Sequence, residues 1–378
     1  MYSVMSYGHM AADGVRMDAY ARAIAAAVKP GSVVLDLGAG TGILSLLAAR
    51  AGARKVHAVE TNPAVLLLAE LARENGFEDR IEIHHMSSFE LTLPEKADVV
   101  VSDLRGSLPL NEAHLALIKD ARERLLRPGG VLVPAEDRLM IALVDSQEVT
   151  RNLEQALDGF DRVGLSAAAT RLSMVNTVFP DGSGNLSASH ALSSAARWTT
   201  LDYAVVEPGV FEGSVDLTMR RGGRANALAV WFDAKVHEGI EYSTGPGHTS
   251  AYTRTLLPLA EPFDVSADDR ARITVRASAG GDRWAWDVEV LDAGGATKAS
   301  LRQATFLGMP ATPAALLRAA TTFTPERSAL GDRIARALAL MDGAHAVGDI
   351  ADRVAEGSPL ARDVVLEEVR DAVARYGR

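Results

Sequence analysis

The sequence predicts an α/β protein with a doubly wound parallel sheet, followed by an antiparallel β-barrel and a small helical domain. Strand-like and helix-like runs alternate through residues 31–134, which is the pattern of parallel βαβ units. After Pro134 short β-rich runs are separated by Gly, Pro, Asp and Ser, as in antiparallel sheets. After Pro313 the spacing of apolar residues is helical again.

These changes divide the chain into four parts, because 378 residues exceed what one compact core usually holds. We expect an N-terminal lid helix in residues 1–30, a Rossmann-like domain in 31–134, a β-barrel substrate domain in 135–310 and a helical domain in 311–378.

The expected elements of the parallel domain follow one another closely. Its strands are predicted at 33–37, 55–59, 81–84 and 97–102, and its helices at 43–51, 63–75 and 112–126. The barrel strands are predicted at 139–144, 201–206, 210–217, 227–236, 273–277 and 284–291. In the last domain, Leu330, Ile334 and Leu338 share one helix face, and Asp342-Gly343 ends that helix.

Composition narrows the classes of function. The net charge of -10 argues against a nucleic-acid partner, which requires a basic face. The chain has no cysteine, no apolar run long enough to span a bilayer and no signal-like N-terminal pattern, so we expect a cytoplasmic protein without a membrane partner. His, Asp and Glu show no metal-ligand spacing, so no metal is expected.

A glycine-rich turn is the principal motif. Gly38, Gly40 and Gly42 follow an apolar strand and open a helix, and glycine lets such a turn approach a ligand closely. Asp36 precedes them, where its carboxylate is suited to the methionyl end of S-adenosylmethionine. Glu60 ends the next strand, where an acid can accept hydrogen bonds from both ribose hydroxyls.

The spacing of these glycines favours S-adenosylmethionine over a dinucleotide. Gly-x-Gly-x-Gly differs from the Gly-x-Gly-x-x-Gly of dinucleotide-binding proteins, and S-adenosylmethionine has no pyrophosphate to hold. A class I methyltransferase is therefore the leading interpretation, with a nicotinamide oxidoreductase as the remote rival.

Residues 7–309 resemble the protein arginine methyltransferase family. The segment from Val34 to Glu60 is similar to its cofactor segment, and residues 10–16 resemble its Met-Leu-x-Asp-x-x-Arg segment. Residues 230–233 and 242–246 resemble a barrel strand of the family and the loop after it. The resemblance implies that Arg16 binds the cofactor carboxylate, that a barrel follows the cofactor domain and that the chain forms a homodimer, with residues 160–195 as a docking arm.

The resemblance and the motif together imply a set of site residues. The expected cofactor contacts are Met10, Arg16, Asp36, Gly38, Gly40, Thr41, Gly42, Glu60, Ser88, Phe89 and Asp103. The candidate catalytic residues are Asp103, Glu112, Tyr7 and His9, and the candidate substrate contacts are Arg105 and Arg254.

Several of these residues depart from the family pattern. The family has two glutamates on the loop after the fourth strand, whereas this chain has Asp103 and Glu112. Arg105 replaces an apolar residue near the methyl donor, Arg254 stands where the family has a Thr-His-Trp loop, and Phe89 replaces an adenine-binding glutamate. A shortened acid and an added cation would weaken a guanidinium clamp.

The sequence therefore predicts an N-methyltransferase that acts on an amine or related nitrogen of a peptide or peptide natural product. The alternatives are methylation of a free amino acid or secondary metabolite, and a catalytically silent scaffold that binds S-adenosylmethionine. The C-terminal residues 311–378 resemble winged-helix domains that recognise leader peptides, which implies a leader-peptide partner. A purely structural helical cap is the alternative for this segment.

Overall fold

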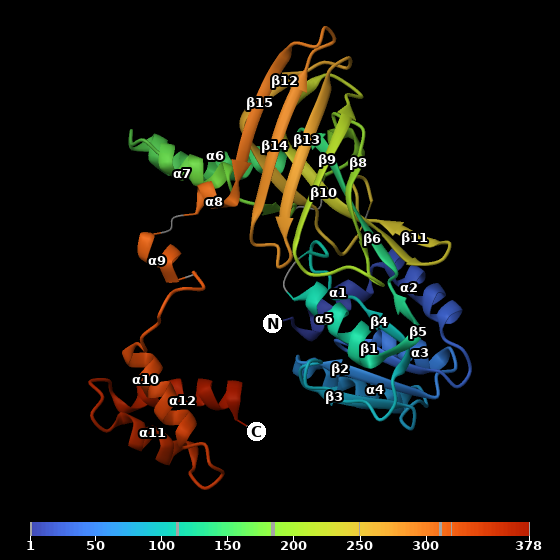
Figure 1. The fold of residues 1–378 in the computed structure, drawn as a ribbon, viewed down its shortest axis with the longest axis vertical. Helices are drawn as coiled ribbons and strands as arrows, with labels where there is room; N and C mark the ends of the chain where they lie inside the picture. The colour runs from blue at the N-terminus through green and yellow to red at the C-terminus, as the bar shows by residue number, and fades with distance from the viewer. Residues whose placement is uncertain are drawn as a thin grey trace. The chain divides into compact units, whose positions relative to one another are not determined.

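The computed structural model describes residues 2–110, 113–182, 186–248, 250–309, 312–318 and 320–377. The chain divides into two compact units, Met1–Met309 and Pro310–Arg378, each with its own apolar core. The first unit contains one parallel sheet and two antiparallel sheets (Figure 1). Among the described residues no helix is both long and apolar enough to cross a membrane.

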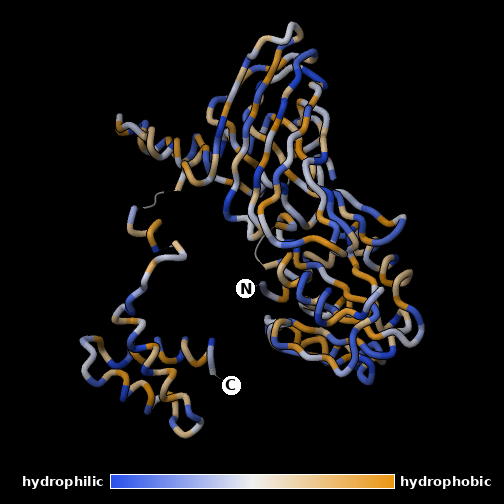
Figure 2. The backbone as a smooth tube through the Cα atoms, viewed as in Figure 1, coloured by the Kyte–Doolittle hydropathy of each residue, from blue (hydrophilic) through white to orange (hydrophobic). Residues whose placement is uncertain are grey.

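The parallel sheet has five strands in the order β3-β2-β1-β4-β5. Their bounds are β1 (Val33–Leu37), β2 (Lys55–Glu60), β3 (Ile81–His85), β4 (Ala97–Ser102) and β5 (Leu126–Val133). All five residues of β1 are buried, which is why this strand is a nearly continuous apolar run, and its surroundings are hydrophobic in Figure 2. The chain reverses its winding direction between β1 and β4, and ligands of such sheets bind at this point, beyond the carboxyl ends of the strands.

Two helices precede this sheet and the others connect its strands. They are α1 (Val4–Ala11), α2 (Gly14–Ala27), α3 (Ile43–Arg50), η1 (Pro63–Leu67), α4 (Leu68–Glu74), α5 (His114–Asp120) and η2 (Ala121–Leu125). Asp13 caps α2 by accepting a hydrogen bond from the Arg16 amide at 3.1 Å, and this cap fixes where the helix starts.

The antiparallel half consists of two sheets, and the described strands do not close into the expected barrel. The larger sheet has the order β7-β12-β10-β6-β8 with β11 paired to β10, and the smaller has the order β15-β14-β13-β9. Their bounds are β6 (Glu136–Val144), β7 (Phe179–Pro180), β8 (Ala196–Asp202), β9 (Val210–Thr218), β10 (Gly223–His237), β11 (Ile240–Ser243), β12 (Thr255–Val265), β13 (Arg270–Ser278), β14 (Trp284–Leu291) and β15 (Thr297–Ala304). The sheets share an apolar core that continues into the parallel domain, so the first unit is one packed body.

Several elements of this half were absent from the sequence prediction. The helices α6 (Gln147–Arg162) and α7 (Ala168–Val175) separate β6 from β7. The short helices η3 (Ala188–His190) and α8 (Thr305–Gly308) complete the first unit. The predicted strand at 201–206 lies too far along the chain, because the residues that pair with β6 are 196–202, which form β8.

The second unit contains only helices and the loops between them in its described residues, 312–318 and 320–377, and no strand that would form a wing is found there. It contains α9 (Pro313–Arg318), α10 (Ala329–Ala339), α11 (Val347–Ala355) and α12 (Arg362–Tyr376). Its core includes Ala337, Ile350 and Val354. Leu330 and Leu338, predicted for the apolar seam, are 44% and 40% exposed because α10 turns Ala337 inward instead.

Candidate cofactor and acceptor site

The glycine loop lies between β1 and α3. Gly38, Gly40 and Gly42 have φ angles of 76°, 56° and 87°, which side chains rarely adopt. A Cβ atom on Gly40 would lie 2.6 Å from the Tyr7 ring. Glycine is therefore required here both by the backbone conformation and by the close approach of α1.

Glu60, at the end of β2, connects the glycine loop to the turn that follows the strand. Its Oε2 atom accepts a hydrogen bond from the Gly40 amide at 3.0 Å, and its Oε1 atom accepts one from the Asn62 amide at 2.8 Å. A cavity of about 90 Å³ lies beside this carboxylate. It is lined by Leu37, Gly38, Val59, Glu60, Thr61, Met86, Ser87, Ser88, Leu104 and Leu117.

Asp36 lies buried in β1, directly before the glycine loop. Its Oδ2 atom accepts a hydrogen bond from the Ser45 hydroxyl at 2.6 Å, whereas Oδ1 has no partner among the described atoms. Burial, together with the nearby acids Glu60 and Asp103, raises the pKa of this carboxyl to about 7, although the hydrogen bonds from Ser45 oppose the rise. A buried carboxylate oxygen without a donor suits a cationic ligand such as an amino group.

Arg16 joins the N-terminal helices to the end of β4. It is only 8% exposed, and its guanidinium donates to the Asp103 carboxylate and to the Met10 carbonyl. Burial alone would lower the pKa of Arg16, but the ion pair with Asp103 raises it above its ordinary value. Arg16 is therefore a fixed cation beside the loop.

Arg105 lies in the interior, where the parallel and antiparallel halves meet, and not on an open pocket. Its Nε and Nη2 atoms donate to the two oxygens of Asp137 at 2.6 and 3.0 Å. Its Nη1 atom is 2.7 Å from the Tyr20 hydroxyl and 2.9 Å from Asp103 Oδ1. The side chain is 0% exposed, and its guanidinium lies 5.2 Å from the centre of the Phe232 ring.

This arginine belongs to a larger buried polar network. Tyr203 donates to Asp137 Oδ2 at 2.5 Å, and its hydroxyl also lies 2.9 Å from His114 Nε2. Tyr242 lies 3.3 Å from Arg105 Nη1. These residues come from distant parts of the chain, so no local spacing in the sequence indicated them.

Asp103 is fully engaged by its neighbours. Its carboxylate accepts hydrogen bonds from Arg16, Arg105 and the Tyr252 hydroxyl. Burial by itself would raise the pKa of Asp103, but the two guanidinium groups hold it below its ordinary value. Such a carboxylate positions cations and is a weak proton acceptor.

The other candidates in α1 differ in their surroundings. Tyr7 packs over Gly40, and burial, followed by the charge of Glu60, raises its pKa to about 12, so the phenol keeps its proton near neutral pH. His9 is exposed, whereas Met10 is half-buried. The backbone carbonyl of Met10 contacts the site by accepting a hydrogen bond from Arg16.

The remaining predicted residues lie in different places. Ser88 is buried and lines the cavity, whereas Phe89 is 51% exposed and is not among the lining residues. Thr41 is half-buried within the glycine loop. Glu112 lies outside the described residues.

Arg254 is buried away from solvent. One of its Nη atoms donates to the Gly245 carbonyl at 2.9 Å and to the His248 carbonyl, and the other lies 3.7 Å from Asp181. Arg254 therefore stabilises the loop after β11. Because its guanidinium is buried and bonded to this loop, it is poorly placed to contact a substrate.

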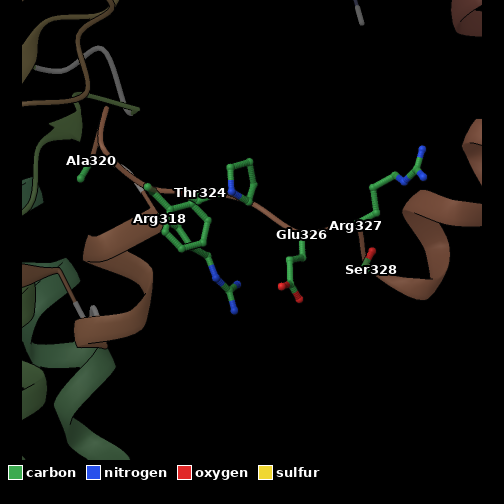
Figure 3. Close-up of a pocket in the computed structure, with 8 residues that line it drawn as sticks. Arg318, Ala320, Thr324, Glu326, Arg327 and Ser328 are labelled. Carbon is green, nitrogen blue, oxygen red and sulfur yellow. The ribbon is translucent and has the colours of Figure 1, made fainter.

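A second hollow, of about 750 Å³, lies in the C-terminal unit along residues 318–328 (Figure 3). All of its lining residues come from this one stretch between α9 and α10, and all are exposed. The labelled side chains spread along the chain and do not converge (Figure 3). This hollow is a bend of the backbone without the convergent polar groups of a binding site.

Comparison with known proteins agrees with this geometry. Residues 20–134 match the family model described as ribosomal protein L11 methyltransferase (PrmA). The chain is 34% identical over 273 residues to the arginine N(omega)-methyltransferase of Streptomyces achromogenes subsp. streptozoticus, covering 68% of this chain and 72% of that protein. It is 30% identical over 286 residues to protein arginine N-methyltransferase 6 of Xenopus tropicalis, covering 71% and 82%.

Solved structures share the fold. Protein arginine methyltransferase 10 of Arabidopsis thaliana superposes with a TM-score of 0.70 at 23% identity, covering 80% of this chain and 97% of that one. The Trypanosoma brucei PRMT1 enzyme-prozyme heterotetrameric complex with AdoHcy gives a TM-score of 0.67 at 25% identity, with 79% and 96% covered.

The fold and the glycine loop define a class I methyltransferase that uses S-adenosylmethionine. Within that class, the chain belongs to the protein arginine methyltransferase family.

Proposed function

We propose that this enzyme methylates an amine or related nitrogen of a peptide or peptide-derived metabolite, and that an arginine guanidinium is a poor acceptor. The observation that carries the proposal is that the Asp103 carboxylate already accepts hydrogen bonds from Arg16, Arg105 and Tyr252. A guanidinium substrate needs acids with free oxygens, and a second guanidinium beside Arg105 would be repelled.

For the cofactor, the residues present fit S-adenosylmethionine. Glu60 would accept hydrogen bonds from the ribose hydroxyls, Arg16 would bind the carboxylate and the unpaired Oδ1 of Asp36 would face the amino group. The sulfonium supplies an electrophilic methyl group, and the chain contributes orientation and electrostatics.

The acceptor nitrogen must lose a proton as it gains the methyl group. Asp103 is a weak base in this geometry, and Tyr7 keeps its own proton near neutral pH. Glu112 remains the proposed acceptor of that proton, through its place in the family pattern.

The test is a substrate panel read by mass spectrometry for addition of a methyl group. The panel contains Gly-Arg-rich peptides, peptides that carry amines and free amino acids, each incubated with S-adenosylmethionine. We expect transfer to amine-bearing peptides and little transfer to arginine peptides. Robust methylation of the arginine peptides by the wild-type enzyme would contradict the proposal.

A free small molecule is the second candidate acceptor. The observation in its favour is the name of the Streptomyces relative, which specifies arginine and not protein arginine. Preference for free amino acids over every peptide in the panel would favour it. Release of S-adenosylhomocysteine with any acceptor would exclude a silent scaffold.

We also propose that the chain forms a homodimer through the arm made by α6 and α7. The large apolar side chains Phe160, Val163, Leu165 and Leu172, on and around this arm, are 37–67% exposed, and such exposure can mark an interaction surface. Light scattering at micromolar concentration should give twice the mass of one chain. A monomer mass for the wild type would refute this proposal.

A further inference from the structure

Two strands of the parallel sheet bring two histidines and a glutamate together away from the glycine loop. His57 lies on β2, and Glu82 and His84 lie on the neighbouring edge strand β3. In the parallel register His57 pairs with Glu82 and Val59 pairs with His84, so the three side chains project from the same face. No spacing in the sequence indicates this group, because its members are split between two strands.

The donor atoms lie at distances suited to a shared ion. His57 Nδ1 is 3.0 Å from His84 Nε2, and Glu82 oxygens lie 3.9 Å from the first nitrogen and 3.7 Å from the second. Two ligands of one zinc ion lie at most about 4.2 Å apart, twice a bond length of about 2.1 Å. All three distances satisfy that limit, with a different Glu82 oxygen facing each ring.

The charges around the three residues also suit a cation. Neutral imidazole is the commonest metal ligand in proteins. Glu82 adds a carboxylate, which pairs with the Lys55 ammonium at 2.9 Å. The side chain of Lys55 is 31% exposed, so it can move into solvent when an ion takes its place.

We propose that His57, Glu82 and His84 form a binding site for a divalent transition metal of the zinc class, distinct from the methyl-transfer site. Two imidazole nitrogens and a carboxylate are a donor set that suits zinc, and a position would remain for water. This proposal does not depend on the identity of the methyl acceptor.

A metal here would join β2 to the edge strand β3. Both strands lead directly into the cofactor cavity, through Glu60 on one and Met86 after the other. Binding to the native state alone raises stability in proportion to the logarithm of metal concentration. We therefore expect zinc to raise the melting temperature of the full-length protein.

The test is calorimetric titration of chelator-treated, full-length protein with zinc chloride, and with magnesium chloride for comparison. His84→Gln and Glu82→Gln remove one ligand each at partly exposed positions, so both variants should fold. His85→Gln is the matched control, because His85 is the next residue of β3, is exposed and projects from the opposite face.

We expect one zinc per chain in the wild type and in His85→Gln, and no magnesium binding. Both ligand variants should bind zinc at least about tenfold more weakly, which corresponds to about 1.4 kcal/mol, and should lose the zinc-dependent rise in melting temperature. Equal zinc affinity in wild type and His84→Gln would overturn the proposal. An equal loss in His85→Gln would also overturn it, since surface histidines in general would then explain the binding.

Discussion

Replacing Arg105 with methionine tests whether the buried network holds the two halves of the first unit together. The change removes charge-assisted hydrogen bonds to Asp137 at 2.6 and 3.0 Å and one to Asp103 at 2.9 Å. It leaves the Asp137 carboxylate buried with no cation beside it. Removing one partner of a buried ion pair usually destabilises a protein by about 3–5 kcal/mol, so we expect a loss of that size.

The assay is equilibrium unfolding in urea, followed by circular dichroism at 25 °C. Arg138→Met is the matched control, because Arg138 pairs with Glu136 and Glu241 at the surface. Surface pairs contribute about 1 kcal/mol or less, so this variant should stay close to the wild type. In the double variant Arg105→Met/Asp137→Leu, the buried charge is gone, and the loss should be smaller than the sum of the single losses.

Two outcomes would refute this reasoning. If Arg105→Met lowers the free energy of unfolding by less than about 1 kcal/mol, its effect is that of a surface ion pair. The Arg105 guanidinium would then be exposed to solvent. Additive losses in the double variant would mean that Arg105 and Asp137 do not interact. The same Arg105→Met protein, used in the substrate panel, should methylate arginine peptides better than the wild type does, because the cation that would repel a second guanidinium beside Asp103 is gone.

Three further predictions address the cofactor, pH and the C-terminal unit. Glu60→Ala should weaken S-adenosylmethionine binding by about 1.5–3 kcal/mol in calorimetry, since charge-assisted hydrogen bonds are lost. The control Glu70→Ala changes an exposed residue and should bind as the wild type does. Equal affinities of Glu60→Ala and the wild type would show that Glu60 does not contact the cofactor. Burial, followed by the charge of Arg105, lowers the pKa of His114 to about 3, so the unfolded state alone takes up a proton below pH 6.5. Between pH 6.5 and 5, the free energy of unfolding in urea should therefore fall by about 2 kcal/mol more for the wild type than for His114→Gln. An equal fall in the two proteins would contradict this prediction. Ending the chain at residue 309 should weaken binding of a substrate that carries its leader peptide and leave cofactor affinity nearly intact. If methyl transfer to substrates with and without a leader slows equally, the C-terminal unit is a structural cap instead.

Local chemistry explains why most of the cofactor half could be predicted from the sequence, although its edge strand β5 was missed. The strand β1, the glycines after it and Glu60 lie within residues 33–60, and each has a conformation or role that its own residue type requires. A buried parallel strand is a short apolar run, and a glycine with positive φ marks a sharp turn. Assignment of these elements did not depend on distant parts of the chain.

The antiparallel half was predicted less well, because its strands depend on their partners. Strand β12 was missed, and it contains Pro258 and Pro262, which usually argue against a strand. In the structure Pro258 pairs with Ala227 of β10, and the register shifts nearby. The expected barrel became two sheets because closure depends on pairing between distant edges, which no local pattern specifies.

The sequence by itself determined the class of fold, the glycine loop and the kind of cofactor, because these depend on neighbouring residues and on residue type. Only the tertiary structure decided what the charged residues do. Arg105 was expected to contact substrate, but Tyr20, Asp137 and Tyr242 lie 85, 32 and 137 positions away in the chain and enclose its guanidinium. The same chain folding placed His57 beside His84, 27 positions apart. A charge must find its partners where it is buried, and the fold alone brings those partners together.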